Sequence, residues 1–309
     1  MDLRNKNVLV TGGAGFIGSH LVDELIKQGA SVAVVDNLSY GKRENVNEKA
    51  QFIECDVLDY EKTREVIRGK ELLFHLAASA TTKESSMGWK DPIYDYRVNA
   101  IGTLNVLRAI IELNQRSQVI YASSAAVCGR PEYTPIDEKH PTNPISPYGI
   151  SKLAGEKYCF AYFSEYGVNS VIMRIFNTYG PRQPRYVMED FIEKLRIDPS
   201  KLEIIGTGEQ TRDFCYVSDV VSAFLAVAES QNAMCETYNV GTGKLTSIKE
   251  LAAMMVAKIS PDARIQLGVE TWKGDIETLG PADITKLRKR GFSPQTRLDE
   301  GLQALIDWH

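Results

Sequence analysis

A tyrosine and a lysine stand four residues apart in the short segment SPYGISK, Ser146 to Lys152. If a helix starts at Pro147, Tyr148 and Lys152 lie one turn apart on the same helix face. A nearby ammonium favours a phenolate, so we expect the pKa of Tyr148 to be lowered. A phenol with a lowered pKa is a usable general base near neutral pH. On this segment alone, an exposed aromatic ring and a solvated lysine remain the alternative.

A glycine-rich segment near the N-terminus has the spacing of a dinucleotide-binding turn. In VLVTGGAGFIGSH, the residues Gly12, Gly15 and Gly18 follow a strand-like run and precede a helical pattern. Such glycines let backbone N–H groups approach a pyrophosphate at the helix N-terminus. Asp36 ends the next strand-like run, where a carboxylate would bind the adenosine ribose. The segment therefore predicts binding of NAD, and the basic pair in the following GKRE leaves NADP as the alternative.

The elements around these candidates alternate between strand-like and helical patterns. The runs NVLVTG, SVAVVD, LLFHLAA and QVIYASS are strand-like, and helical patterns near residues 17–28 and 98–113 fall between them. Continuous apolar runs of this kind are typical of parallel strands that are covered on both faces. A helical pattern after Lys152 leads to the further strand-like run SVIMRIF. We therefore predict an α/β fold with a Rossmann-type, doubly wound parallel sheet.

The composition changes after residue 176, where NTYGPRQPR is rich in proline, glycine and arginine. We predict a NAD-binding Rossmann domain over residues 1–176, with returning segments near 214–240. Residues 177–309 would form most of a smaller C-terminal lobe that binds the substrate. Open α/β sheets bind ligands at the carboxyl ends of their strands, so the expected site is a cleft between these two parts.

The composition is that of an ordinary globular protein, with 309 residues, 43% hydrophobic and 25% charged. A formal net charge of −4 gives no basic footprint for nucleic acid. No apolar run reaches the roughly 20 residues that span a bilayer, and no signal peptide is recognised, so we expect a cytoplasmic protein with no membrane partner. The five cysteines and four histidines are scattered, which argues against a disulfide framework and against a catalytic metal.

Motifs throughout the chain resemble those of one family. After the glycine-rich turn come DNLSYGKRENV, CDV, FHLAA, YASSAAVCG, SPYGISK, RIFNTYGPRQ and RDFCYVSDV, in this order. Through them the chain resembles the extended short-chain dehydrogenase/reductase family, and within it the NAD-dependent nucleotide-sugar epimerases and dehydratases. The resemblance covers nearly the full length and implies NAD as cofactor and a nucleotide sugar as substrate.

The resemblance implies three sets of site residues. In the catalytic set, the tyrosine is the acid/base, the lysine orients the nicotinamide ribose and the serine bonds the substrate oxygen; the set is Ser124, Tyr148 and Lys152. The last two also belong to the cofactor set, whose other members are Gly12, Gly15, Phe16, Ile17, Gly18, Asp36, Asn37, Asp56, Val57, Leu76, Ala77, Ala78 and Asn99. The substrate set is Ser124, Asn177, Arg182, Arg185, Arg212 and Lys273. Ser123 is the alternative to Ser124.

Two positions depart from the family's pattern. The family often has a tyrosine where this chain has Cys128, close to the expected sugar site. A second phosphate-binding arginine is commonly found where this chain has Trp272. The adjacent Lys273 would replace that arginine as a point charge without bidentate geometry.

The residues after the catalytic serine indicate which reaction the resemblance implies. The 4,6-dehydratases and the decarboxylating members carry acids there, whereas this chain has Ala125 and Ala126, which cannot move a proton. The resemblance therefore implies 4-epimerisation, as in UDP-galactose 4-epimerases. Tyr148 would take the proton of a sugar hydroxyl while a hydride passes to NAD, and the keto intermediate would turn over before the hydride returns.

We therefore expect an isomerase that interconverts UDP-glucose and UDP-galactose. The alternatives are an NAD(P)-dependent nucleotide-sugar reductase or dehydrogenase, a dehydratase, and a NAD-binding regulatory protein without turnover. Pro281 stands where some relatives have a bulky aromatic residue, which implies room for N-acetylated sugars.

Related enzymes commonly dimerise by pairing two helices from each chain. The corresponding helices here are the stretch 98–113 and the helix after Tyr148, whose YCFAYFSEY carries more apolar surface than one core face requires. We expect a homodimer with a four-helix interface.

Overall fold

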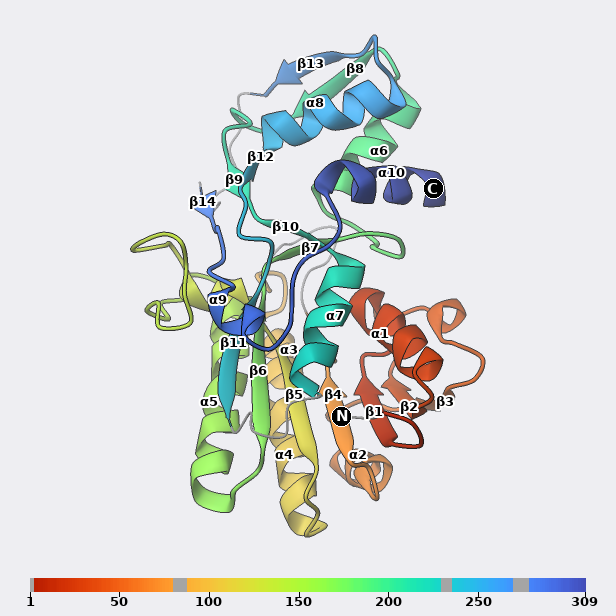
Figure 1. The fold of residues 1–309 in the computed structure, drawn as a ribbon, viewed down its shortest axis with the longest axis vertical. Helices are drawn as coiled ribbons and strands as arrows, with labels where there is room; N and C mark the ends of the chain where they lie inside the picture. The colour runs from red at the N-terminus through yellow and green to blue at the C-terminus, as the bar shows by residue number, and fades with distance from the viewer. Residues whose placement is uncertain (1–2, 80–87, 229–234, 269–277) are drawn as a thin grey trace.

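Seven parallel strands form the central sheet of the protein (Figure 1). The computed structural model describes residues 3–79, 88–228, 235–268 and 278–309. In spatial order the strands are β3 (Gln51–Glu54), β2 (Ser31–Asp36), β1 (Asn7–Thr11), β4 (Leu72–His75), β5 (Gln118–Ser124), β6 (Ser170–Ile175) and β11 (Glu236–Val240). All neighbouring pairs are parallel. The first six strands have the order of a doubly wound Rossmann sheet, so the predicted fold is confirmed.

Helices cover both faces of this sheet. One face packs against α1 (Phe16–Lys27) and α7 (Val217–Ala228), and the other against α2 (Tyr60–Ile67), α4 (Gly102–Glu112) and α5 (Pro147–Tyr166). Val8 and Val10 of β1 belong to the first core, whereas Leu9 between them belongs to the second. Successive side chains of a strand point to opposite faces, which explains why these strands are continuously apolar.

The predicted helix over 98–113 is part of a longer helical segment. It begins with α3 (Pro92–Tyr96), continues through one π-helical stretch, Arg97–Ile101, and ends with α4. Asp91 caps its N-terminus by accepting a hydrogen bond from the backbone N–H of Tyr94, at 2.9 Å. The π-helical stretch changes the direction of the side chains locally, and such stretches are frequent at functional sites.

The helix that carries the tyrosine and the lysine starts where the sequence predicts. Pro147 is in its first turn, and the Ser146 side chain caps it by accepting a hydrogen bond of 3.1 Å from the N–H of Gly149. The helix ends at Gly167, which has a left-handed conformation with φ of 70°. These local signals place Tyr148 and Lys152 at the carboxyl edge of the sheet.

A smaller lobe stands beyond that edge, at the top of Figure 1. Its core includes Phe191, Leu202, Met255 and Leu302. The lobe consists of α6 (Val187–Ile197), β8 (Lys201–Ile204), α8 (Ile248–Ile259), β13 (Arg264–Leu267) and α10 (Leu298–Trp308).

Short strand pairs join the lobe to the sheet. In the first pair β7 (Asn177–Tyr179) lies beside β10 (Phe214–Tyr216), and in the second group β9 (Thr211–Arg212) lies between β12 (Thr246–Ser247) and β14 (Thr278–Leu279). Three elements of the second half of the chain belong to the large sheet and its core instead of the lobe, namely α7, β11 and the short α9 (Thr285–Arg288). Leu287 of α9 lies in the sheet's core. The division of the chain at residue 176 stays a prediction.

Two further expectations concern cysteines and membranes. All five cysteines are free and buried. Burial raises the pKa of the Cys128 thiol to about 11, and its side chain lies in the sheet's core. Within the described ranges, no helix combines the length and the apolar character needed to cross a membrane.

Candidate active site

A pocket at the carboxyl ends of β1, β2 and β4 collects most of the predicted cofactor residues. Those along its lining are Gly12, Gly15, Asp36, Asn37, Asp56, Val57, Leu76, Ala77 and Ala78. The lining also contains residues that the sequence did not single out, namely Val35, Ser39, Tyr40, Gly41, Cys55, Ser79, Tyr94 and Val98. Tyr94 and Val98 belong to α3 and the π-helical stretch, so only the packing of that segment against the sheet reveals them.

The turn after β1 has the geometry of a phosphate cradle. Gly12 has φ of 72°, and a Cβ there would lie 2.7 Å from the backbone nitrogen of Ala77. A Cβ on Gly18 would collide with the carbonyl oxygen of Gly12. The N-cap Gly15 provides no side-chain cap, and the first turn of α1, which includes Phe16 and Ile17, has no acidic side chain. Its N–H groups and the helix dipole are therefore available to an anion, which fits the pyrophosphate of NAD.

Asp36 is buried at the end of β2 and supports the same turn. Its two carboxylate oxygens accept hydrogen bonds from the N–H groups of Ala14, at 3.0 Å, and Leu38, at 2.9 Å. Burial raises the pKa of Asp36, and these two hydrogen bonds oppose the rise. Beside it, the Asn37 amide donates to Asp56 at 3.0 Å. Each carboxylate oxygen has a second lone pair, so Asp36 remains able to accept ribose hydroxyls.

Lys152 is buried beneath the tyrosine. Its Nζ donates a hydrogen bond of 2.7 Å to the carbonyl of Ala122 and lies 5.0 Å from the ring centroid of Tyr121 and 6.0 Å from that of Tyr148. Burial lowers the pKa of Lys152 to about 8, although the carboxylates of Asp95 and Glu156 oppose this change. The side chain is 2% exposed, so its ammonium acts in a medium that screens charge weakly.

The prediction that the pKa of Tyr148 is lowered is wrong, because the surrounding protein raises it. Desolvation by burial raises the pKa of this phenol, and the nearby Tyr186 and Asp95 raise it further. A hydrogen bond with Ser124 and the charge of Arg185 oppose the rise but do not outweigh it. The Lys152 ammonium points to a backbone carbonyl of β5 instead of making an ion pair with the phenol, so desolvation dominates.

The neighbouring serines of β5 have different partners. Ser124 lies close enough to Tyr148 to oppose the rise of its pKa, and the Ser124 Oγ accepts a hydrogen bond of 3.2 Å from the N–H of Ala126. Ser123 instead donates to the buried carboxylate of Glu156. The structure thus brings Ser124, and not Ser123, to the tyrosine. Both Ala125 and Ala126 are buried in the 3₁₀ turn that follows, Ala125–Cys128.

Asn99 connects the helical segment to the pocket. Its side-chain oxygen accepts a hydrogen bond of 3.0 Å from the N–H of Ser79, and its amide donates to the carbonyl of Ser79 at 2.8 Å and to Oγ of Ser151 at 2.9 Å. Ser79 follows the pocket residues at the end of β4. The asparagine therefore holds this part of the pocket in place against α5.

Two of the predicted substrate residues have a buried polar atom without a hydrogen-bond partner in the described part of the chain. The side-chain oxygen of Asn177 and Nε of Arg185 are buried and find no hydrogen-bond partner among the described residues. The Arg185 guanidinium lies over the Tyr40 ring, 5.5 Å from its centroid. Phe214 pairs with Asn177 in the β7–β10 ladder, so Arg212 lies only two residues from that position.

The other predicted substrate arginine, Arg182, has a partner elsewhere. The Arg182 guanidinium forms an ion pair of 2.8 Å with Asp23 of α1, so its predicted contact with substrate stays a prediction. Lys273 and the neighbouring Trp272 lie outside the described residues.

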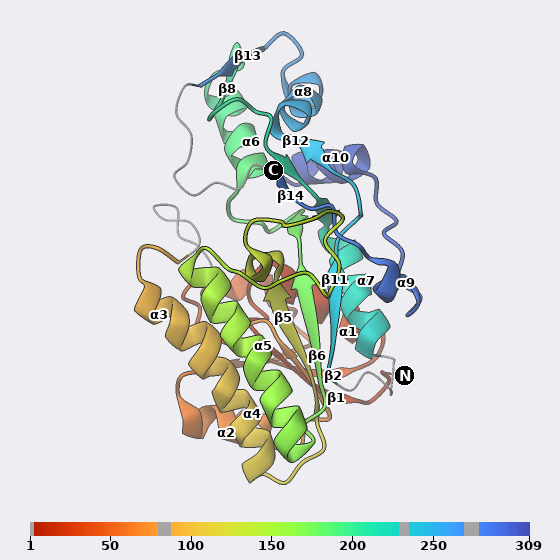
Figure 2. The ribbon, with the colours of Figure 1, turned by 90° about the vertical axis from the view of Figure 1, so that its left-hand side faces the viewer.

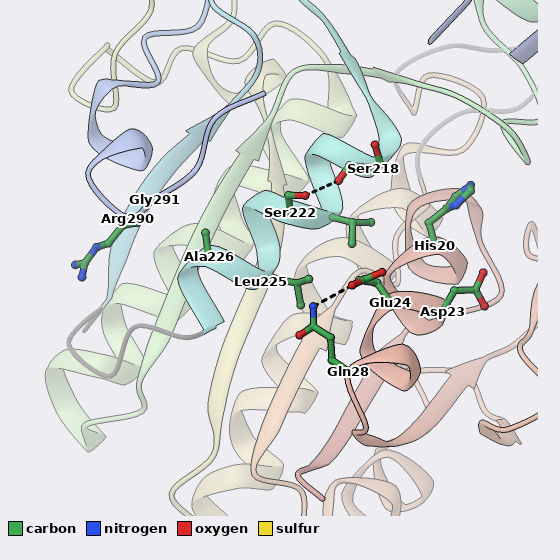
Figure 3. A pocket seen from close by; sticks show the side chains of 11 residues that line it. His20, Asp23, Glu24, Gln28, Ser218, Ser222, Leu225, Ala226, Arg290 and Gly291 are labelled. Atoms are coloured by element: carbon green, nitrogen blue, oxygen red, sulfur yellow. Dashed lines mark hydrogen bonds between the residues drawn. The ribbon is translucent and has the colours of Figure 1, made fainter. Parts of the chain in front are cut away.

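A larger hollow of about 610 Å³ lies elsewhere, between α1 and α7 (Figure 3). Figure 3 shows His20 and Glu24 on α1 facing the side of α7 that carries Ser218 and Ser222. None of the described residues along this hollow belongs to a predicted site. The cofactor pocket is thus the better candidate, because most of the predicted cofactor residues line it.

Comparisons with known proteins agree with this geometry. Residues 8–241 match the NAD dependent epimerase/dehydratase family. A putative UDP-glucose 4-epimerase of Methanocaldococcus jannaschii is 38% identical, over 97% of each chain. The UDP-glucuronic acid decarboxylase 1 of Xenopus tropicalis is 33% identical, over 98% of this chain and 72% of its own. The crystal structure of the UDP-glucose 4-epimerase of Thermotoga maritima with UDP-glucose has a TM-score of 0.90 and 36% identity, over 98% of each chain.

Proposed function

The chain belongs to the NAD-dependent epimerase/dehydratase family, and from this premise we propose that it is a nucleotide-sugar 4-epimerase that interconverts UDP-glucose and UDP-galactose. One observation carries the proposal. Ser124 and Tyr148 meet at the site, whereas the following Ala125 and Ala126 are buried and have no proton to transfer. Eliminating water or carbon dioxide from the sugar would need a further acid or base at that position, and epimerisation at C4 does not.

The cofactor pocket fits NAD in each of its parts. The N–H groups at the start of α1 would hold the pyrophosphate, and Asp36 would hold the adenosine ribose and repel a 2′-phosphate. Lys152 would contact the nicotinamide ribose from below. When bound, NAD supplies an oxidised nicotinamide that accepts a hydride from C4, returns it and carries a positive charge.

The chain's own residues would move the proton. Tyr148 would take it from the 4-hydroxyl of the sugar and return it, and Ser124 would hold the same substrate oxygen. Because burial raises the pKa of the phenol, positive charge near the phenol is required for it to act as a base at neutral pH. Lys152 contributes part of this charge from beneath the ring. Epimerisation is redox-neutral, so the site needs no external oxidant.

Two observations support a nucleotide sugar as the ligand. The buried polar atoms of Asn177 and Arg185 lack partners within the described part of the chain, and a ligand with hydroxyl and phosphate oxygens would satisfy them. Arg212 offers a planar fork that matches phosphate oxygens. Asn177 lies on β7, Arg185 on the segment before α6 and Arg212 on β9.

The proposal is tested by incubating the purified protein with a panel of nucleotide sugars, without added cofactor, and resolving the products by chromatography. We expect UDP-glucose and UDP-galactose to interconvert, without net formation of NADH. Formation of one NADH per product would indicate a dehydrogenase, and release of carbon dioxide from UDP-glucuronate would indicate a decarboxylase. Either outcome, or NAD binding without any turnover, would overturn the proposal. If NAD is lost during purification, catalytic amounts should restore the activity.

We also propose that the protein is a homodimer. The outer side of α3 and α5, which faces the viewer in Figure 2, exposes apolar residues. Ile93 is 73% exposed, Ile150 51%, Tyr96 40% and Phe160 37%. Exposed apolar side chains of this kind favour association of two chains. Ile93 and Tyr96 lie on α3, outside the stretch 98–113, so a four-helix interface through that stretch stays a prediction.

A further inference from the structure

A carboxylate that no motif singled out is buried beside the proposed catalytic residues. Asp95 lies on α3, where it packs against α5, and is 1% exposed. Its Oδ1 accepts a hydrogen bond from Oγ of Ser151, and its Oδ2 finds no hydrogen-bond partner within the described ranges. A Cβ on Gly88 would lie 2.9 Å from Oδ2, so only a glycine fits over this oxygen. Burial of a carboxylate is costly, so its presence calls for a partner of opposite charge.

The hydrogen bonds around Asp95 form a chain of donors that leads from Asn99 through Ser151 to the carboxylate. The Asn99 amide donates to Oγ of Ser151 at 2.9 Å. Ser151 has a single proton, which it shares between Oδ1 of Asp95 and the backbone carbonyl of Tyr148, at 3.0 Å from Oγ. The chain of donors therefore ends on Asp95 as an acceptor, which is the arrangement that suits an ionised carboxylate.

Among the described residues, Lys152 is a cation whose charge acts on Asp95. The other buried carboxylate near the lysine, Glu156, already accepts hydrogen bonds from Arg174, of 3.0 and 2.8 Å, and from Ser123. Burial raises the pKa of Asp95, while its hydrogen bond with Ser151 and the charge of Lys152 oppose the rise. The Asp95 carboxylate in turn opposes the lowering of the Lys152 pKa.

Other titratable groups of the described residues surround Lys152 and Tyr148. Lys152 is faced by Glu156 and Cys159 of α5, Tyr121 of β5 and His75 of β4, whose pKa burial lowers to about 3. Tyr148 is faced by Tyr186 and Arg185 from the segment before α6. Because burial lowers its pKa to about 3, His75 is neutral at physiological pH.

We propose that Asp95 is a positioning residue of this site, whose carboxylate keeps the Lys152 ammonium charged and, through Ser151, holds the first turn of α5 that carries Tyr148. The kinetic consequences of this inference rest on the proposed function. Its ionisation consequences do not; they follow from the burial of Asp95 against α5, its hydrogen bond with Ser151 and its effect on Lys152. A negative charge at Asp95 favours the protonated form of both neighbours. Removal of this charge should therefore make both Lys152 and Tyr148 lose their protons at lower pH.

The first experiment compares the pH dependence of kcat in Asp95→Asn and wild type. Asparagine keeps the shape and the acceptor oxygen for Ser151 but removes the charge. We expect both limbs of the bell-shaped profile to move to lower pH by about one unit, a tenfold change in each ionisation ratio. Ser151→Ala is the matched control, because it removes the hydrogen bond and keeps the charge. It should lower kcat without moving the limbs, and an unmoved profile in Asp95→Asn would overturn the inference.

The second experiment does not depend on the sugar. The ionisation of Tyr148 is followed by NMR with ¹³Cζ-labelled tyrosine, and its resonance is assigned by its absence in Tyr148→Phe. We expect Asp95→Asn to lower the midpoint of this titration, with and without NAD. If the midpoint moves while no nucleotide sugar is epimerised, the proposed function fails and the inference stands. If epimerisation occurs and the midpoint does not move, the inference alone is overturned.

A third measurement keeps the aspartate at position 95 and therefore does not depend on whether Asp95→Asn folds. The carboxyl of Asp95 is labelled with ¹³Cγ-aspartate and assigned by its shift in Ser151→Ala. We expect this carboxyl to be ionised at pH 7. A protonated carboxyl at that pH would contradict the proposal, because a neutral acid cannot hold the charge of Lys152.

Discussion

Ser123 of β5 donates a hydrogen bond of 2.6 Å to Oε1 of Glu156 on α5. Glu156 is fully buried and forms an ion pair of 2.8 Å with Arg174, which is also buried. The hydroxyl of Ser123 therefore helps to satisfy an interior charge pair. Its neighbour Ser124 is left to serve the tyrosine.

Alanine substitutions should separate the roles of the two serines. Ser123→Ala removes a donor from a buried carboxylate and should lower the free energy of unfolding by about 1.5–3 kcal/mol, with kcat within about threefold of wild type. Ser124→Ala should leave the stability nearly unchanged and lower kcat by about 10²-fold or more, as for loss of a donor to a reacting oxygen. Urea denaturation and product chromatography measure the two quantities. A larger loss of kcat in Ser123→Ala would reverse this assignment.

Substitutions of Tyr148 and Lys152 should differ in their response to pH. Tyr148→Phe removes only a hydroxyl, so the fold and NAD binding should persist while epimerisation falls by about 10²–10⁴-fold at every pH. Lys152→Met removes the ammonium, so the phenol ionises only at higher pH and activity should recover partly as the pH rises. Circular dichroism and NAD titration provide the controls. Near-wild-type turnover by Tyr148→Phe would show that the tyrosine is not the base.

His75 should make the protein sensitive to acid. Its Nδ1 accepts from Thr11 at 2.7 Å and its Nε2 donates to Thr103 at 3.0 Å, since Thr103 uses its own proton on the carbonyl of Asn99. Burial lowers the pKa of His75 from 6.5 to about 3. The unfolded chain therefore binds a proton below pH 6.5 that the folded chain refuses, and stability falls as the pH falls from 6.5 towards 3.

This loss is measured by urea denaturation at pH 6.5 and pH 4.5. A histidine that is half protonated in the unfolded chain at pH 6.5 and unprotonated in the folded chain contributes about 2 kcal/mol over this range. His75→Gln cannot be protonated, so its stability should fall by about 2 kcal/mol less than that of wild type. Equal losses in the two proteins would show that His75 is not the source.

The apolar side of α5 should control assembly. Phe160→Asp places a charge in the proposed interface, so the dimer should dissociate at micromolar concentration while the chain stays folded. Ile197→Asp is a matched control, because Ile197 is 78% exposed at the end of α6 in the smaller lobe. Light scattering after size-exclusion chromatography measures the mass. A monomeric wild type, or a dimeric Phe160→Asp, would contradict the four-helix interface.

The wall near Pro281 should admit N-acetylated sugars. Proline is smaller than the aromatic residue of some relatives, and the carbonyl of Pro281 accepts a hydrogen bond of 2.8 Å from the N–H of Ile136. We expect kcat/KM for UDP-N-acetylglucosamine within 10³-fold of that for UDP-glucose, and each is measured by chromatography under the same conditions. A larger ratio corresponds to a barrier above about 4 kcal/mol and would mean that other residues close the site.

The parts of the site that the sequence determined by itself have short-range signals. The spacing of Gly12, Gly15 and Gly18 predicted the turn before α1, because left-handed geometry and close backbone contact require glycine there. Pro147 predicted the start of α5, and the helical repeat then placed Tyr148 and Lys152 on one face. Continuous apolar runs predicted the parallel sheet, since they reflect burial on both faces.

Only the tertiary structure decided which groups act together. Arg182 pairs with Asp23, 159 residues away, and the carboxylate of Asp95 accepts a hydrogen bond from Ser151 because α3 packs against α5. The pKa of Tyr148 is raised because desolvation outweighs a lysine that its spacing places one turn away. Helix starts and glycine turns depend on neighbours along the chain. Desolvation and charge pairing depend instead on which elements pack together, and this is set by contacts spread over the whole sequence.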